Sequence, residues 1–422
     1  MARTVAGSAT LSPARIRFAL TALALGGFAI GSTEFVAMGL LPDIAHAMLP
    51  AVWARSHEAA NAQAGLMVSA YALGVVVGAP TIAASAARLP RKRLLMWLLV
   101  AFTVSTVAAA LSPNFPSLLL FRFICGLPHG AYFGIASLVA ASLMGEGKRA
   151  RGVAFVLTGL TVANVVGVPA ITWVGESWGW RTAYLCVAGL FALTFAAVAL
   201  AVPWQPGNPE QTLRRELSAF RHPQLWFALG MGAIGFGGFF ALYTYIAPLV
   251  TDVAGLPQQP WVPLMLVTCG LGMFVGNLIG GIAADRALKR TIIVSFLAVM
   301  VTLAFTGAFA HVPVLLFLGV FLVGAASSAV SPAVQTRLMD VAHDAQSIAA
   351  ALNHSAFNMG NSLGAYLGGV VVGLGLGYRA PVWIGIVLSF LGLVVAVVSF
   401  TVERRSGRLR AHTRPLDITM PA

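Results

Sequence analysis

The chain has 422 residues, of which 59% are hydrophobic and 9% are charged. Soluble proteins carry about 25% charged residues, so this composition excludes an ordinary water-soluble fold. It also excludes a disordered chain, because disordered chains are polar and charged. The net charge of +13 would suit nucleic acid, but the basic residues lie in short clusters between apolar runs, which is typical of membrane proteins. The composition therefore predicts a membrane protein that binds no nucleic acid.

Apolar runs separated by polar breaks follow one another along the chain. They cover residues 16–41, 62–87, 94–111, 116–144, 152–175, 182–202, 224–250, 261–284, 291–310, 313–337, 347–374 and 380–402. These runs are long enough to cross a bilayer as helices, and lipid cannot satisfy an open backbone. The sequence thus predicts an all-α polytopic membrane protein with 12 transmembrane helices. The first run is too long for a cleavable signal, and further spans follow it.

Basic side chains are divided unequally between the two sides of these spans. With the N-terminus placed in the cytoplasm, 22 of the 26 Lys and Arg residues lie in cytoplasmic segments, three lie on the other side, and Arg122 lies within a span. The three outer residues are Arg55, Arg181 and Arg379. Because basic loops remain inside, we expect both termini to be cytoplasmic.

The chain also repeats itself at one offset. Matching residues lie 198 positions apart in three pairs: Arg88 with Arg286, Gly126 with Gly324, and Arg181 with Arg379. Two six-helix halves in parallel are predicted by such a repeat. We expect an N-terminal half at 1–202, a cytoplasmic linker at 203–222, a C-terminal half at 223–402 and a cytoplasmic tail at 403–422.

Two loops at equivalent places in the halves carry a recognisable motif. Residues 281–290 (GIAADRALKR) are similar to the loop signature G-x-x-x-D-R-x-G-x-R/K-R/K, with Leu288 in place of the second glycine. The first-half loop at 83–93 keeps the basic residues, Arg88 among them, but lacks the first glycine and the acidic residue. The signature belongs to the major facilitator superfamily, so the chain resembles that family.

Three further motifs narrow the resemblance. Residues 122–126 (RFICG) resemble the arginine motif of the fourth span, and residues 31–42 are similar to the first span of the arabinose-efflux-permease branch. Residues 159–169 resemble the fifth-span motif of drug/proton antiporters, with Val168 between Gly167 and Pro169. The resemblance implies a 6+6 helical fold and proton-coupled export. It also implies a conformational loop made of Arg88, Gly281, Asp285, Arg286 and Arg290, while Gly167 and Pro169 are expected to bend the fifth helix.

Glu34 is the one acidic residue well inside a predicted span. Ionisable groups in a membrane are costly and mark a function by default. Counting from the span centres places Glu34 about 7 Å and Arg122 about 10 Å toward the outer side, at similar depths. One interpretation is that Glu34 carries a proton beside Arg122. The alternatives are a permanent Glu34–Arg122 ion pair that locks two helices, and a carboxylate tied to neighbouring groups for packing.

Other polar and aromatic residues are predicted near the midplane. The candidate cavity residues are His129, Phe133, Asn164, Tyr243, Asn358 and Asn361, and His354 is a lesser candidate. The histidines, the asparagines and Tyr243 have structural alternatives: a histidine bonded to a neighbouring helix, amides that bridge helices, or a packing stripe of Tyr243 with Phe236 and Phe240.

These features predict a proton-coupled secondary transporter that exports small organic compounds, sugar-like, nucleoside-like or drug, across the bacterial inner membrane. Proton-coupled uptake of a sugar or nucleoside is the alternative. A membrane-embedded enzyme is less favoured, because the sequence has no clustered catalytic groups, no metal-ligand spacing and no Walker loop. Cys125, Cys186 and Cys269 fall in apolar runs and suggest no disulfide. We expect no cofactor or metal, a monomer, and a small molecule, protons and lipid as partners.

Overall fold

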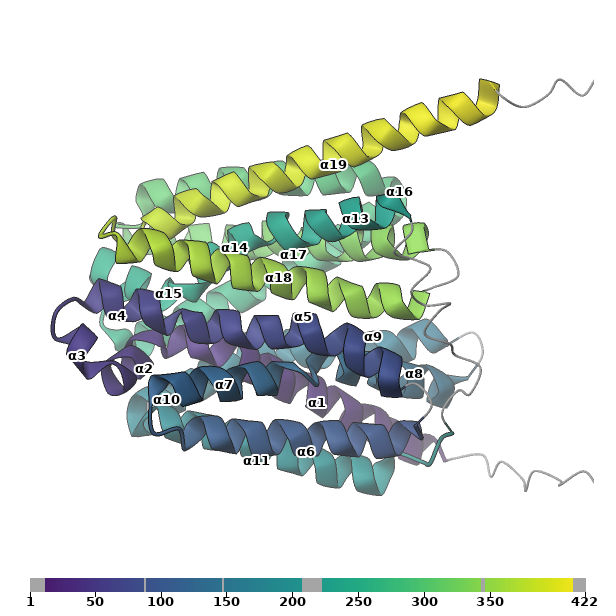
Figure 1. Ribbon diagram of the computed structural model, residues 1–422, viewed down its shortest axis with the longest axis horizontal. Coiled ribbons are helices and arrows are strands. Elements are labelled where there is room, and N and C mark those ends of the chain that lie inside the picture. The colour runs from purple at the N-terminus through teal and green to yellow at the C-terminus, as the bar shows by residue number, and fades with distance from the viewer. Residues whose placement is uncertain (1–11, 87–88, 146–147, 207–221, 343–345, 413–422) are drawn as a thin grey trace, which may run out of the picture.

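The computed structural model describes residues 12–86, 89–145, 148–206, 222–342 and 346–412. Within these residues long helices lie side by side in one bundle (Figure 1). Helix α1 (Pro13–Gly39) starts and α19 (Ala380–His412) finishes at the same end of the bundle, which we call the terminal end. Short helices α2, α3 and α4 lie at the opposite end, which we call the far end.

The N-terminal half contains α1 to α11. After α1 its helices are α2 (Leu41–Met48), α3 (Pro50–Trp53), α4 (His57–Ala64), α5 (Leu66–Ala86), α6 (Arg91–Ala110), α7 (Phe115–Gly126), α8 (His129–Met144), α9 (Arg149–Val162), α10 (Val168–Trp178) and α11 (Trp180–Ala201). A π-helical turn, Ala163–Gly167, joins α9 to α10. Polar side chains cap three of these helices: Ser12, Ser56 and Asn114 each accept a hydrogen bond from a backbone N–H in the first turn, as expected at helix N-termini.

The C-terminal half contains α13 to α19. Its helices are α13 (Pro223–Gly230), α14 (Gly237–Thr244), α15 (Ile246–Pro248), α16 (Gln258–Phe309), α17 (Pro313–Ala342), α18 (Gln346–Gly373) and α19. Two more π-helical turns, Met231–Gly235 and Leu249–Val253, interrupt its first span.

The described residues contain ten helices that are long and apolar enough to cross a membrane. One of them, α16, is bent at Ala287, whose backbone is not helical, so two helices join there. Before the bend, Gly272 meets Phe321 and Gly280 meets Ala329, so the first part of α16 runs parallel to α17. After the bend, Thr306 meets Gly319 across a short connection, so the second part of α16 runs antiparallel to α17. Helix α18 has 28 residues and is not one of these ten; it carries asparagine, serine and histidine among its apolar residues. With α16 counted as two and α18 added, the ten become the twelve expected helices.

The internal repeat is visible in the packing of the helices. A Cβ at Gly74 would collide with the backbone carbonyl of Phe123, and a Cβ at Gly272 would collide with that of Phe321. Both members of the second contact lie 198 residues after those of the first, the offset found in the sequence. The halves therefore share a backbone scaffold in which two helices approach closely where glycine replaces a larger side chain.

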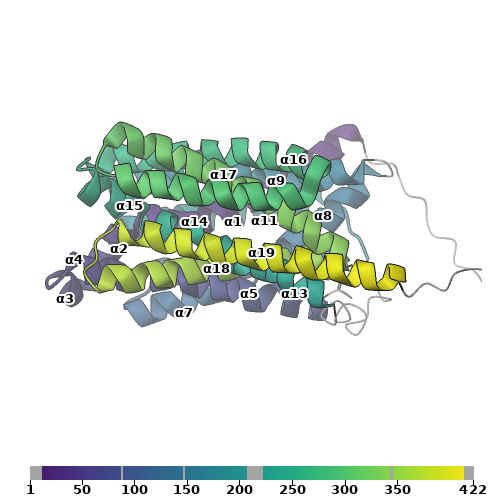
Figure 2. The same ribbon diagram turned by 90° about the horizontal axis from the view of Figure 1, so that it is seen from above.

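The halves meet along α5 and α18, which lie side by side in the middle of the bundle (Figures 1 and 2). The Ser69 hydroxyl on α5 donates to the Ser362 carbonyl on α18 at 3.1 Å. The candidate site lies next to this seam.

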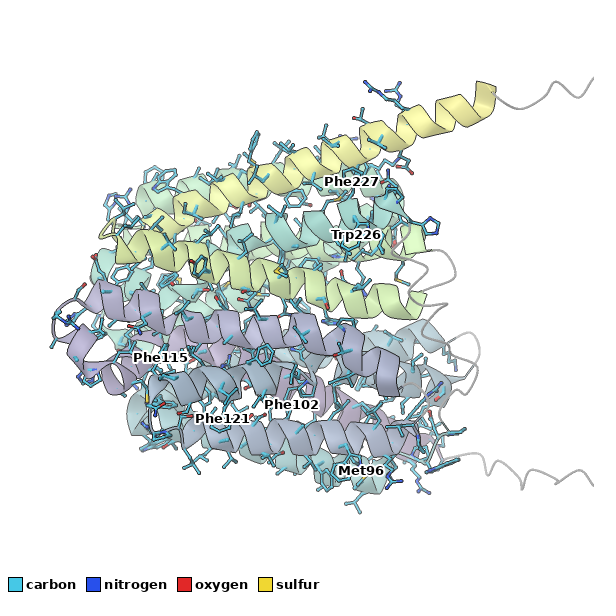
Figure 3. All side chains as sticks on the ribbon, viewed as in Figure 1. Met96, Phe102, Phe115, Phe121, Trp226 and Phe227 are labelled. Carbon is cyan, nitrogen blue, oxygen red and sulfur yellow. The ribbon has the colours of Figure 1, made fainter. Side chains whose placement is uncertain are left out.

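The sides of the bundle are covered by hydrocarbon side chains. Figure 3 shows side-chain nitrogen atoms mainly at the two ends, while large apolar residues such as Trp226 on α13 point outward. Trp97, Val104 and Leu193 are also exposed on α6 and α11. Apolar patches of this extent suit lipid rather than water.

Candidate functional site between the halves

Glu34 lies on α1 in the interior of the bundle, 4% exposed. Its Oε1 atom accepts a hydrogen bond of 3.3 Å from Nδ2 of Asn361, which belongs to α18 of the other half. A buried carboxylate needs partners, because taking the charge out of water is costly. Here one of those partners comes from the half that must move if the two halves separate.

Arg122, on α7, is fully buried beside α1. Its Nη1 atom donates to the backbone carbonyl of Thr33 at 2.9 Å, and its guanidinium carbon lies 4.4 Å from the centre of the Tyr71 ring. The ion pairs between described residues do not include Glu34 with Arg122, so the structure does not form the locked pair that was one of the alternatives. Arg122 instead holds the backbone one residue before Glu34, and its charge reaches the carboxylate through space.

His129, the first residue of α8, connects three elements. Its Nδ1 atom lies 3.0 Å from the Tyr71 hydroxyl of α5 and 3.9 Å from Oε2 of Glu34. Its ring also packs against Phe133 on the same helix and against His354 on α18, with centroid distances of 5.3 and 5.6 Å. His129 and Phe133 were both candidate cavity residues from the sequence. The structure brings His129 to Glu34, and Phe133 lies beside His129.

Buried amides line the same region. Asn361 is fully buried, Asn164 lies in the π-helical turn, and Asn358 donates to the His354 carbonyl at 3.1 Å. Among the described residues, the side-chain oxygens of all three lack a hydrogen-bond partner. An unpaired buried acceptor costs about 1–3 kcal/mol, so these oxygens are available to a ligand or to water.

Aromatic rings from the other half pack against Phe35, the residue that follows Glu34 on α1. Phe35 lies 6.2 Å from Phe240 and 5.8 Å from Tyr243, both on α14. Tyr243 in turn stacks on Phe239 at 5.0 Å. The structure therefore places Tyr243 in an aromatic group that joins the two halves. One face of the Tyr243 ring is covered by Phe239.

The fifth span is irregular at the predicted bend. The π-helical turn ends at Gly167, and Pro169 follows in the first turn of α10. A Cβ at Gly167 would meet Phe28 and Ser32 of α1. This segment thus packs closely against the helix that carries Glu34.

The predicted conformational loop lies apart from this site. Gly281 has open space around it, and Asp285, Arg286 and Arg290 are exposed near the bend of α16. Arg88 lies outside the described residues. Lys289, in the same loop, forms a 2.8 Å ion pair with Glu403, which also pairs with Arg337; sequence reasoning did not assign these three residues a role.

Contacts at the far end, also missed from sequence, tie the halves together. Asn61 donates to the Tyr378 hydroxyl at 2.7 Å, and Gln258 donates to Oδ2 of Asp43 at 2.7 Å. Burial raises the pKa of Asp43, while the hydrogen bond from Gln258 acts against that rise. Burial likewise raises the pKa of Tyr378, to about 12. Only the folded chain reveals these pairs, because their partners lie more than 200 residues apart in sequence.

The comparisons with known proteins agree with this architecture. The inner membrane transport protein YdhP of Escherichia coli (strain K12) is 37% identical over 385 residues, which are 91% of this chain and 96% of that protein. A chloramphenicol resistance protein of Streptomyces lividans is 33% identical over 378 residues, 89% of this chain and 94% of that protein.

A solved structure shares the fold at low sequence identity. The crystal structure of a D-xylose-proton symporter superposes with a TM-score of 0.70 at 18% identity, covering 91% of this chain and 97% of that chain. The model of the Major Facilitator Superfamily matches residues 23–270 and 261–416. With two repeated halves and this match along nearly its whole length, the chain belongs to the Major Facilitator Superfamily of membrane transporters.

Proposed function

We propose that this transporter exports small organic compounds across a bacterial inner membrane in exchange for protons. The observation that carries the proposal is the contact between the buried Glu34 carboxylate and Asn361 of the other half, at 3.3 Å. Export is supported by the relative named for chloramphenicol resistance, and the inner membrane by the relative from E. coli.

The contact offers a physical route for coupling. An ionised Glu34 accepts strongly from the Asn361 amide, and hydrogen bonds to charged groups contribute about 1.5–3 kcal/mol. Protonation removes the charge and weakens this link between the halves. A neutral hydrogen bond contributes about 1–1.5 kcal/mol less than a charged one, and about 1.4 kcal/mol changes an equilibrium tenfold. Proton binding at this carboxyl can therefore shift the balance between two access states by roughly tenfold.

The same region supplies groups for a polar or aromatic substrate. We propose that His129, Phe133, Asn164, Tyr243, Asn358 and Asn361 line the cavity when the halves part, with the three unpaired amide oxygens accepting hydrogen bonds from the substrate. A substrate group that hydrogen-bonds Glu34 or Asn361 would compete with the link between the halves. That competition would tie substrate release to proton binding.

The orientation follows from the distribution of basic residues. We propose that the terminal end is cytoplasmic and the far end faces outward, so that Arg55, beside α3, lies outside. A reporter fused after His412 should then report the cytoplasm, and one inserted beside Arg55 should report the outside. Opposite signals would reverse the direction of every step above.

We propose that the loop of Arg88, Gly281, Asp285, Arg286 and Arg290 is involved in the change of access, as its resemblance to the family signature implies. The exposure of Asp285 and Arg286 leaves them free to form contacts in a second state.

Everted vesicles test the exchange. A thermal-shift screen of the purified protein with chloramphenicol, D-xylose and a set of nucleosides selects the compound with the largest shift, which we call the probe compound. Addition of the probe compound should dissipate an imposed pH gradient in vesicles that contain the wild-type protein. Probe-driven proton movement in the symport direction would favour uptake, and none at all would exclude proton coupling.

Glu34→Gln keeps the shape and hydrogen bonding of the side chain and removes its titratable charge. We expect this variant to bind the probe compound, to retain probe-for-probe counterflow and to lose at least about 90% of gradient-driven export. Asp252→Asn is the matched control, because Asp252 is an exposed carboxylate at the far end, and it should transport like wild type. Gradient-driven export by Glu34→Gln at the wild-type rate would refute the role given to Glu34.

A further inference from the structure

Three rings meet where α8 of one half faces α18 of the other. Phe133 stacks on His354 with a centroid distance of 5.0 Å and an interplanar angle of 4°. His129 lies 5.6 Å from the same His354 ring at 58°. His354 is thus the C-terminal half's titratable side chain in direct contact with a residue that faces Glu34.

The positions along the bundle put these groups in order. Asn361, on α18, touches Glu34, and His354 precedes it by seven residues on the same helix. Seven residues of α-helix span about 10 Å, so His354 lies about two turns nearer the terminal end. His129 connects these two positions along the bundle, since its ring contacts His354 and its Nδ1 lies 3.9 Å from Glu34. Glu34, His129 and His354 therefore form a descending series of titratable side chains.

We propose that His354 is a proton-relay residue, which receives through His129 the proton that Glu34 releases and passes it toward the terminal end. This inference rests on the proposed function, in which Glu34 binds the transported proton. The relay crosses from one half to the other, so it exists only while α8 and α18 are in contact.

The relay moves one proton and starts with both histidines, His129 and His354, in their neutral form. The O–H bond of protonated Glu34 breaks as an N–H bond forms on His129, leaving a carboxylate and an imidazolium. His129 then gives a proton to neutral His354 and returns to its neutral form. Rotation of the carboxyl side chain or a bridging water molecule would close the 3.9 Å gap between Glu34 and His129. Rotation of a ring or a second water molecule would do the same between His129 and His354, whose ring centroids are 5.6 Å apart.

The surroundings of His129 suit a relay. Titratable groups face it from each neighbouring element that contacts its ring: Glu34 from α1, Tyr71 from α5 and His354 from α18. The Tyr71 hydroxyl, 3.0 Å from Nδ1, fixes the ring and exchanges a hydrogen bond with it. The Arg122 guanidinium lies over the Tyr71 ring and is the fixed positive charge of this group.

Packing alone is the competing account of His354, because a ring stacked on Phe133 needs no proton. His354→Phe keeps a ring for that stack and removes the titratable nitrogens, whereas His354→Gln keeps hydrogen bonding and removes the ring. The relay predicts that both variants bind the probe compound and retain at least half of probe-for-probe counterflow. Both should reduce gradient-driven export, and the protons moved per probe molecule, at least about tenfold.

The controls separate a relay from a structural role. His311→Gln removes an exposed histidine at the far end and should match wild type. Phe133→Leu disturbs the stack and should lower export and proton movement in the same proportion. Wild-type proton movement by His354→Phe would overturn the relay, and so would equal losses of counterflow and proton movement in both His354 variants. A wild-type protein that moves no protons would instead contradict the proposed function.

Discussion

The two halves of this transporter share a scaffold but not its chemistry. Where the N-terminal half has Tyr71, Arg122 and His129, the positions 198 residues later hold Cys269, Val320 and Ser327. The close contact of Gly126 with the Tyr71 carbonyl recurs as that of Gly324 with the Cys269 carbonyl. The repeat therefore conserves where backbones touch, while the charged and titratable groups around Glu34 are concentrated in one half.

The C-terminal half contributes neutral amides and one histidine to the same site. Asn361 and His354 reach Glu34 and His129 from α18. A carboxylate in one half that accepts a hydrogen bond from a neutral amide in the other is suited to a switch, because this hydrogen bond weakens when the carboxylate is protonated. Two charged halves would instead attract or repel each other in every state.

The largest expected effect concerns the shared scaffold. Gly74→Leu and Gly272→Leu each place a side chain against a backbone carbonyl that cannot retreat. Overpacking typically costs about 1–3 kcal/mol, and more where backbone must shift. We expect both variants to lose most of their folded protein in fluorescence-detected size-exclusion chromatography.

Gly281→Leu is the control for that pair, because Gly281 has open space around it, and its monodisperse peak should persist. If Gly74→Leu folds normally and Gly272→Leu does not, the two halves do not depend on equivalent contacts.

Much of this arrangement could be predicted from the sequence. The apolar runs located the spans. The 198-residue offset between Gly126 and Gly324 indicated that the two halves repeat the same close helix contacts. Glu34 stood out because an ionisable group inside an apolar run is costly and marks a function by default. These signals are local or periodic, so a single chain displays them.

The partners of Glu34 could not be predicted in the same way. Depth counting brought Arg122 to the right level, but the choice between the Glu34 carboxylate and the Thr33 carbonyl depends on the rotation of two helices. Asn361 lies 327 residues from Glu34, and its contact requires the halves to be docked. Neither the rotation of the helices nor the docking of the halves produces a periodic pattern in the sequence.

The next largest effect is expected at Arg122. Arg122→Val copies Val320 into the N-terminal half, removes the positive charge near Glu34 and removes the side-chain donor to the Thr33 carbonyl. Arg122 is fully buried, and replacing a large buried side chain by a smaller one leaves a cavity, so the melting temperature should fall while a folded fraction remains. Gradient-driven export should drop at least tenfold in proteoliposomes.

Val320→Ile, a change of similar depth in the other half, should keep more than half of the export. Full export by Arg122→Val would mean that the chemical asymmetry of the halves is not what couples them to protons.

The smallest effect concerns the terminal end, where the halves differ in one charge. Lys289 forms an ion pair with Glu403 at 2.8 Å. The residues 198 positions earlier are Arg91 and Gln205, and Arg91 donates a hydrogen bond to Oε1 of Gln205 at 3.4 Å. Glu403→Gln therefore gives the C-terminal half the neutral pairing of the N-terminal half. Lys289 is half exposed and Glu403 about a third exposed, and such ion pairs contribute only about 0–1 kcal/mol.

We expect Glu403→Gln to lower the melting temperature by no more than about 2 °C and to leave export unchanged. Arg337→Met should cost more, because Arg337 is buried and donates to both Glu403 and Gln224, so its loss leaves two acceptors short of a donor. A difference of several degrees between these variants, with Arg337→Met the lower, is the result that scanning fluorimetry should give. If Glu403→Gln proves as harmful as Arg337→Met, the charge of Glu403 itself holds α16, α17 and α19 together, and the neutral pairing in the N-terminal half is not its equivalent.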